Sequence, residues 1–136
     1  MIKIEIVKKD IKTVAKVVII DEKDRVLFLK RSNYSEKFKG EWDLPGGHLR
    51  ENEYLISGLE REVKEETQLS VREPKFITHM DNLYFFWCKY DSQPVKLSDE
   101  HTGYKFFDKN QLDPKDKFQK IAIRALEIKD DQVKYQ

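Results

Sequence analysis

The chain has 136 residues, of which 39% are hydrophobic and 38% are charged, and its 26 basic and 25 acidic residues give a formal net charge of +1. A chain of this length builds one hydrophobic core, so we expect a single domain over residues 1–136. The balanced charge excludes a global attraction to nucleic acid or to an anionic membrane, so any phosphate recognition has to be local.

Cysteine content and hydropathy indicate the cellular setting. Cys88 is the only cysteine, which excludes a disulfide framework, and its apolar neighbours favour a buried structural thiol. Residues 1–10 alternate apolar and charged side chains and lack the core of a signal peptide. No apolar run approaches the roughly 20 residues that a membrane span requires. We therefore expect a cytoplasmic protein without a membrane partner.

The first part of the chain is expected to form strands and then a loop. Isoleucines at every second position predict a strand at residues 2–7, and a run of β-branched residues predicts another at 13–20. A charged turn at residues 21–24 is followed by a returning hairpin strand at 26–29. Residues 40–47 combine a proline with glycines, which is typical of a loop.

The rest of the chain alternates helix and strand patterns. Apolar residues at helical spacing predict a central helix over residues 53–67. Two strands are expected at 71–80 and 82–90, and a short one at 104–107. Residues 118–126 repeat at i, i+3, i+4, i+7 and i+8, which predicts a C-terminal amphipathic helix. This order predicts an α+β fold with a mixed β-sheet between helices.

Three glutamates of the central helix have a spacing that suits metal binding. Glu62, Glu65 and Glu66 lie three and four residues apart, so they project into an arc of roughly 100°. Converging like charges are repulsive unless a divalent cation binds, and oxygen ligands suit Mg²⁺ or Mn²⁺ better than Zn²⁺. The alternative is a solvated face of glutamates and lysines, and the helix spacing alone does not exclude it.

The residues before these glutamates favour the metal site. Gly47 is followed after five residues by Glu53 and, after seven more, by the segment Arg61-Glu62-Val63-Lys64-Glu65-Glu66-Thr67-Gln68-Leu69. This pattern resembles the Nudix box, GX5EX7REUXEEXGU, in which U is a bulky apolar residue. The resemblance implies a Nudix-like α/β/α sandwich. It also implies a Mg²⁺-dependent pyrophosphohydrolase that cleaves a diphosphate linkage, in a nucleoside diphosphate-X or (d)NTP substrate, by attack of water at phosphorus.

One box position departs from the pattern, because Gln68 stands where the family has a late glycine. Glycine readily takes the left-handed conformation that ends a helix. A glutamine there either costs roughly 1 kcal/mol or ends the helix differently. The departure therefore concerns helix termination and not metal ligation.

The resemblance also implies roles for individual residues. Three box glutamates match the ligands of one or more Mg²⁺ ions, for which Mn²⁺ is an alternative: Glu62, Glu65 and Glu66. Gly46 matches the position whose backbone carbonyl joins them. Arg61 matches the box arginine, which orients the glutamates through charge-assisted hydrogen bonds, and Glu53 is expected in the same network.

A carboxylate has to accept the proton of the attacking water. Glu65 and Glu66 are candidates for this base, and so is Glu100, which resembles the late acidic residue of the family and lies just before the strand expected at 104–107. The three alternatives stay open. The neighbouring His101 is expected to be a surface residue.

Substrate contacts are expected near the box loop. Lys30 and Arg31 end a strand that should run beside this loop, where they can bind phosphate. Trp42 and Phe38 flank the loop and can stack on a nucleobase, although Trp42 fits equally well as a core residue. The partner we expect is a small nucleotide, without a nucleic-acid-binding surface, and the sequence leaves homodimer formation open.

Two other functions use the same fold. The chief alternative is a non-catalytic Nudix-like module that senses a nucleotide and acts through a partner, which the intact box acids disfavour. A relative acting on isoprenoid diphosphates requires a catalytic cysteine in the cleft, and Cys88 inside an apolar strand fits that poorly.

Overall fold

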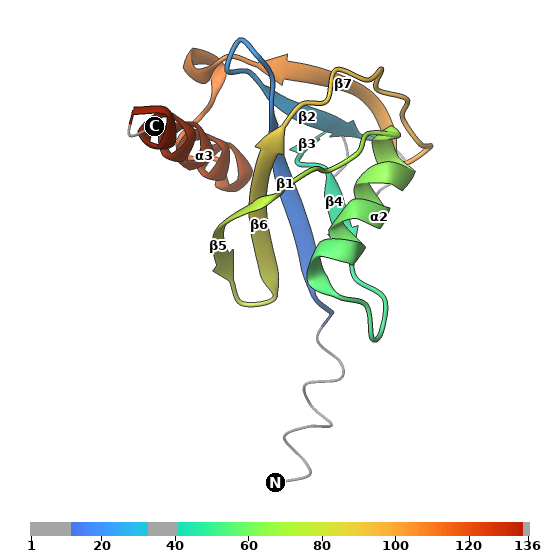
Figure 1. The fold of residues 1–136 in the computed structure, drawn as a ribbon. Helices are drawn as coiled ribbons and strands as arrows, with labels where there is room; N and C mark the ends of the chain where they lie inside the picture. The colour runs from blue at the N-terminus through green and yellow to red at the C-terminus, as the bar shows by residue number, and fades with distance from the viewer. Residues whose placement is uncertain (1–11, 33–40, 135–136) are drawn as a thin grey trace, which may run out of the picture.

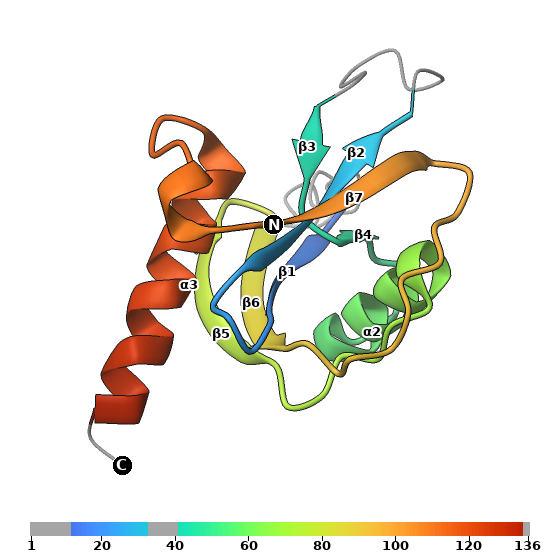
Figure 2. The same ribbon diagram turned by 90° about the horizontal axis from the view of Figure 1, so that it is seen from above.

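The computed structural model describes residues 12–32 and 41–134, so the strand expected at residues 2–7 lies outside the described residues. A mixed sheet forms the centre of the molecule, and the helices α2 (Leu55–Thr67) and α3 (Lys117–Lys134) lie on opposite sides of it (Figures 1 and 2). The predicted α+β architecture, with a mixed sheet between helices, is confirmed.

Strand β1 (Val14–Ile20) is the central strand of the sheet. It pairs in parallel with β6 (Leu83–Lys89), from Val14 opposite Leu83 to Ile20 opposite Lys89. Its other neighbours are antiparallel: β2 (Val26–Arg31), reached through the predicted charged turn, and the short β4 (Gly46–His48). β1 therefore lies directly beside the glycines that precede the acidic helix.

The remaining strands extend the sheet on both sides. Strand β2 pairs with β3 (Trp42–Asp43) and along its length with β7 (His101–Phe107), while β5 (Lys75–Met80) pairs with β6 at an edge. Two of these strands begin at other residues than predicted. β7 begins three residues earlier than expected because its pairing with β2 continues to His101. β5 begins after Pro74, which has no N–H for a strand ladder.

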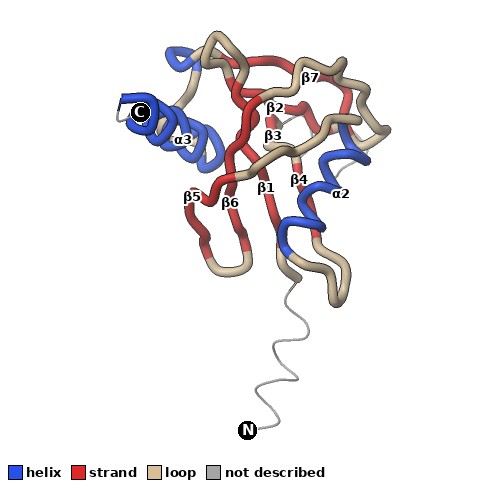
Figure 3. Tube along the Cα trace, in the orientation of Figure 1, coloured by secondary structure: helices blue, strands red, loops and turns tan. Residues whose placement is uncertain are grey.

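The loop expected at residues 40–47 contains two short strands, β3 and β4, in the part that the structure describes. A 3-10 turn, η1 (Lys109–Gln111), joins β7 to α3. Figure 3 shows β4 and the loop that follows it beside α2, whereas η1 lies on the other side of the molecule, near α3. The pairing of β4 with β1 fixes the glycine loop on the sheet.

The central helix α2 begins two residues later than predicted, because Tyr54 is its N-cap and Glu53 lies before it. The C-terminus of α2 shows how the helix ends at Gln68 without the late glycine of the box. That residue adopts the left-handed conformation, with φ 64°, and its N–H donates to the carbonyl of Lys64 at 3.0 Å. The glutamine therefore ends the helix in the conformation that glycine favours.

Side chains of β1 alternate between two hydrophobic clusters. Ala15, Val17 and Ile19 belong to the cluster under α2, and Val18 and Ile20 belong to the cluster under α3. Burial on both faces explains why the strand reads as a nearly continuous apolar run.

Cys88 lies in the cluster under α2 and is 2% exposed. Burial raises the pKa of its thiol to about 12, so the prediction of a buried structural thiol is confirmed. Among the described residues, no helix has the length and apolar character needed to cross a membrane.

Candidate active site

Gly46 places the backbone of its loop directly against α2. Its φ of +130° is a conformation that residues with a Cβ rarely adopt, and an added Cβ would lie 2.0 Å from the carbonyl oxygen of Ala15. In this position the Gly46 N–H donates to Oε1 of Glu66 at 2.7 Å. The loop and the acidic helix thus meet at one backbone-to-carboxylate hydrogen bond.

Glu66 is 5% exposed, which is unusual for a glutamate. Burial raises the pKa of its carboxyl to about 8, against the opposing effects of the Lys16 charge and the hydrogen bond from Gly46. The nearby carboxylates Asp43 and Glu62 raise this pKa further. A bound cation would favour the ionised form and remove the conflict between charge and burial.

Arg61 joins the carboxylates on the outer side of the helix. Its Nε donates to Glu53 at 2.7 Å and its Nη2 donates to the other oxygen of that carboxylate at 2.9 Å. Its Nη1 reaches Glu62 at 3.1 Å and both oxygens of Glu65 at 3.2 Å. The Arg61 guanidinium, helped by the N–H of Arg50, lowers the pKa of Glu53 to about 2. The expected network of Arg61 and Glu53 is therefore present in the structure.

Two glycines give these carboxylates room. A Cβ on Gly47 would lie 2.6 Å from a carboxylate oxygen of Glu62, and a Cβ on Gly58 would lie 2.6 Å from Leu49 and 3.0 Å from the Glu53 carboxylate. Gly58 therefore packs on the segment before the helix. The Glu62 carboxylate therefore lies directly against the backbone of Gly47.

The loop before β7 is fastened to the end of α2. Lys96 donates its N–H to the carbonyl of Thr67 at 2.9 Å, and Ser98 donates to that of Glu66 at 3.0 Å. Both carbonyls lie in the last turn of the helix, where carbonyl groups have no N–H partner within the helix. The attachment brings the next residues, Glu100 and His101, to the side chain of Glu66.

Among the described residues, Glu66, Glu100 and His101 form a group whose potential ligand atoms all lie within 4.8 Å of one another. Glu100 is exposed, whereas His101 is 6% exposed. The prediction that His101 is a surface residue was wrong, because β7 begins at this residue and pairs it with Arg31 of β2. Glu62 and Glu65 are instead turned toward Arg61.

Lys16 and Asp43 lie beside this group, and sequence reasoning missed both. The Lys16 ammonium lies 3.0 Å from Asp43, and its side chain also donates to the carbonyl of Leu44 at 3.2 Å. The same carboxylate accepts from Arg31 at 2.8 Å. The available signal was a lysine inside an otherwise apolar strand, since a buried charge needs a partner.

The residues expected to contact the substrate lie in different environments. Arg31 is half-buried in its ion pair with Asp43, and Lys30 is exposed at the end of β2. Trp42 packs edge-on against Phe107, with ring centroids 5.2 Å apart, at the border of the α3 cluster. Phe38 lies outside the described residues. Contacts of these residues with substrate remain predictions.

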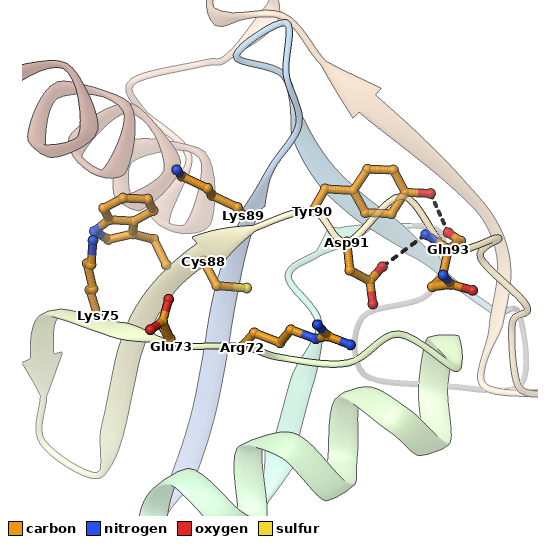
Figure 4. A pocket seen from close by; sticks show the side chains of 9 residues that line it. Arg72, Glu73, Lys75, Cys88, Lys89, Tyr90, Asp91 and Gln93 are labelled. Atoms are coloured by element: carbon orange, nitrogen blue, oxygen red, sulfur yellow. Dashed lines mark hydrogen bonds between the residues drawn. The ribbon is translucent and has the colours of Figure 1, made fainter. Parts of the chain in front are cut away.

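A hollow of about 470 Å³ lies apart from this group, between the segment after α2 and the end of β6 (Figure 4). Cations and carboxylates line it together, including Arg72, Glu73, Lys75 and Asp91. Tyr90 donates its hydroxyl proton to the carbonyl of Gln93 at its rim. None of its lining residues is among the predicted site residues.

The family model described as NUDIX domain matches residues 11–127. The chain belongs to the NUDIX domain family. The match covers the box, the late loop and most of α3.

Curated relatives match only part of this NUDIX chain. The 8-oxo-dGDP phosphatase NUDT18 of Homo sapiens is 29% identical over 83 residues, which are 61% of this chain. The match spans 25% of the human protein, and the Mus musculus protein of the same name matches to the same extent at 28% identity. The chain thus spans about a quarter of the length of these relatives.

Solved structures match over most of the chain. The MutT protein from Methanosarcina mazei Go1 is 25% identical, with a TM-score of 0.66, and the match covers 88% of this chain and 94% of that one. An ADP-ribose pyrophosphatase from Streptococcus suis 89-1591 is 21% identical, with a TM-score of 0.71, and the match covers 87% and 91% of the two chains. The second likeness is one of fold alone.

Proposed function

We propose that this chain is a divalent-cation-dependent pyrophosphohydrolase that cleaves a diphosphate linkage in a small nucleotide. The observation that carries the proposal is the position of Glu66. Its carboxylate is buried, accepts the N–H of Gly46 and lies within 4.8 Å of ligand atoms of Glu100 and His101. A buried carboxylate beside a second one is stable as an anion when a cation neutralises both.

The donor set fits such a cation. Two carboxylates and a ring nitrogen converge in the cluster, and the carboxylates of Glu62 and Glu65 lie along the same helix. Oxygen-rich sites of this kind bind Mg²⁺ or Mn²⁺. We assign Glu62, Glu65 and Glu66 as the ligands supplied by the helix and the Gly46 carbonyl as a backbone ligand.

The chain's own residues then have separate tasks in hydrolysis. The cation, when bound, neutralises the bridging phosphates and lowers the pKa of a ligated water. Arg61 holds Glu62 and Glu65 in place through hydrogen bonds of 3.1 and 3.2 Å. Arg31, half-buried beside Asp43, carries the positive charge that a substrate phosphate would meet at the end of β2.

The proton of the attacking water goes to a carboxylate, for which Glu65, Glu66 and Glu100 are the candidates. A base and a ligand differ in what their loss changes. Replacing the base with glutamine lowers kcat and leaves cation affinity unchanged, whereas replacing a ligand weakens the cation as well. Because these residues are also proposed ligands, the base is the one whose Glu→Gln variant still loses kcat when the cation is saturating.

The substrate class that we propose is a nucleoside di- or triphosphate or a nucleoside diphosphate-X. The support is the relatedness to an 8-oxo-dGDP phosphatase, over a region that is a quarter of its length, and to a MutT protein. We propose that the NUDIX domain occupies residues 1–136 as a single unit that carries this activity.

The test is a screen of the purified chain against nucleoside triphosphates, 8-oxo-dGDP, ADP-ribose and dinucleoside polyphosphates, each with Mg²⁺ or Mn²⁺. Release of phosphate, pyrophosphate or nucleoside monophosphate is scored. We expect turnover of at least one member, and a loss of at least ~100-fold in kcat for Glu66→Gln. Glu60→Gln is the matched control, because Glu60 is an exposed glutamate of the same helix.

Absence of turnover on every member, combined with tight binding of one nucleotide, would instead support the non-catalytic sensing module. Chemistry through a cysteine is disfavoured, because Cys88 is buried under α2 and burial raises the pKa of its thiol to about 12.

A further inference from the structure

His101 is buried without a partner for its ring. It is 6% exposed, and among the described residues neither Nδ1 nor Nε2 has a hydrogen-bond partner. An imidazole ring always offers at least one N–H donor, and the neutral ring also offers an acceptor, so a buried histidine normally satisfies at least one nitrogen. A nitrogen of this ring is therefore available to a group that is absent from the protein chain itself.

The surroundings indicate which kind of group that is. One ring nitrogen and one carboxylate oxygen from each of Glu66 and Glu100 lie within 4.8 Å of one another. Two ligands on opposite sides of an ion, each at about 2.1 Å, lie about 4.2 Å apart. The three donors therefore need only a small contraction to close around one divalent cation. Glu100 is exposed, so the cluster is open to an entering ion on that side.

Backbone hydrogen bonds hold the three donors in place. Ser98 donates to the carbonyl of Glu66 at 3.0 Å, and His101 donates to that of Ser98 at 3.3 Å. Ser32 donates to the carbonyl of Glu100 at 2.9 Å. The donors thus come from α2, from the loop that ends at Glu100 and from the first residue of β7, and these hydrogen bonds hold the three segments together.

A bulge in β7 accounts for the direction of the ring. Gly103 lies opposite Lys30 and His101 lies opposite Arg31, so Thr102 is an extra residue between the two pairs. Such an insertion interrupts the period of two along a strand, so the residues on its two sides no longer alternate in step. The bulge thus frees His101 from the alternation of the rest of β7 and lets it share a cluster with Glu66.

We propose that His101 donates a ring nitrogen to a divalent cation held together with Glu66 and Glu100, and that this nitrogen makes the site favour first-row transition ions over Mg²⁺. Mg²⁺ prefers oxygen ligands and retains its waters, whereas imidazole is a good ligand for transition ions. The inference rests on the proposed function, because both assign Glu66 as a ligand of the cation. The aspect it adds is a nitrogen ligand from outside the acidic helix.

Mn²⁺ alone is the probe, because pulsed electron paramagnetic resonance of bound Mn²⁺ detects a directly ligated nitrogen. We expect a ¹⁴N coupling in the wild-type protein that changes to the ¹⁵N pattern when the histidines are ¹⁵N-labelled. This measurement needs neither a variant nor turnover. A wild-type protein that binds Mn²⁺ without nitrogen coupling would overturn the proposal.

His101→Phe assigns the coupling to one of the three histidines and preserves a ring of similar size. We expect the coupling to vanish, the Kd for Mn²⁺ to rise at least ~10-fold and the Kd for Mg²⁺ to change less than ~3-fold. His79→Phe is the matched control, because His79 is an exposed histidine on β5, and it should leave all three quantities unchanged. Equal weakening of both ions in His101→Phe contradicts the proposed selectivity.

The readouts separate this inference from the proposed function. Histidine coupling in a protein that turns over no nucleotide would support the ligand and refute the enzyme. Turnover with Mg²⁺ or Mn²⁺ in a protein without histidine coupling would support the enzyme and refute the ligand. If His101→Phe does not fold, His101→Asn removes the imidazole with a side chain that still forms hydrogen bonds, and the same loss of coupling is expected.

Discussion

The backbone N–H of Ser98 donates to the carbonyl oxygen of Glu66 at 3.0 Å. This bond joins residues 32 positions apart in the chain, at the point where α2 ends. Because it fixes the loop that carries Glu100 and His101, it places these side chains beside the box helix.

The backbone at Gly46 tolerates no side chain. We expect Gly46→Ala to destabilise the fold by about 3 kcal/mol or more, because its Cβ would meet the Ala15 carbonyl at 2.0 Å in a conformation with φ +130°. Gly103→Ala is the matched control, since nothing lies within 4 Å of its added Cβ. That control should change stability by less than about 1 kcal/mol. Urea unfolding of both variants measures the difference, and similar midpoints would contradict the steric argument.

Replacing Gln68 with glycine should stabilise the protein. The glutamine holds a left-handed conformation at the end of α2, which costs a residue with a Cβ roughly 1 kcal/mol more than glycine. We therefore expect Gln68→Gly to raise the free energy of unfolding by about 1 kcal/mol, measured by urea denaturation. Gln68→Ala keeps the Cβ and should show no such gain. Turnover should be the same in both variants, because Gln68 ends the helix and lies outside the proposed cation site.

The ion pair of Glu53 with Arg61 gives stability a definite pH dependence. Hydrogen bonds from Arg61 and from the Arg50 N–H lower the pKa of Glu53 from its ordinary value of 4.5 to about 2 in the folded protein. A folded pKa below the unfolded one stabilises the protein fully above the unfolded value, and the effect is lost as the pH falls toward the folded value. The stability difference between wild type and Glu53→Gln should therefore be constant above about pH 5 and shrink toward pH 2.

Urea unfolding at a series of pH values measures this difference. The exposed Glu60 of α2, the helix that carries Arg61, provides the control, and Glu60→Gln should follow the wild-type curve throughout. A Glu53→Gln curve parallel to wild type down to pH 2 would show that the Arg61 contact contributes nothing to folding.

The thiol of Cys88 should be unreactive in the native protein. Burial raises its pKa to about 12, so almost no thiolate exists at pH 8. We expect a thiol-specific reagent to react at least ~100-fold more slowly with the folded protein than with the protein in denaturant. Rapid labelling of the folded chain would mean that β6 opens or that this thiol is accessible, and would reopen chemistry through the cysteine.

Two carboxylate variants test whether Glu65 and Glu66 belong to the proposed cation site. Glu65→Gln and Glu66→Gln should each lower kcat by at least ~100-fold, because each removes a charged group from the proposed cation site. Steady-state kinetics measure the loss, and thermal unfolding checks that each variant is folded. Unchanged turnover in both variants would refute the assignment of these glutamates.

Local patterns in the sequence were sufficient for most of the fold. Periodicity predicted α2, α3 and the principal strands among the described residues, since burial on one face imposes periods of 3.6 and 2. Boundaries were less accurate where pairing with a distant strand decided them. β7 extends to His101 because β2 continues beside it, and β5 begins after Pro74, beyond the buried Val71.

The spacing of Glu62, Glu65 and Glu66 by itself predicted that they share a helix face, because separations of three and four residues are local. The resemblance to the box added the expectation that Arg61 and Glu53 belong to the same network. Only the tertiary structure decided that Glu66 is the buried one and that Lys16 pairs with Asp43 beside it. It also decided that His101 and Glu100 both lie beside the carboxylate of Glu66. Those relationships depend on strand pairing, on a bulge in β7 and on a loop fastened to a helix end, which no local period encodes.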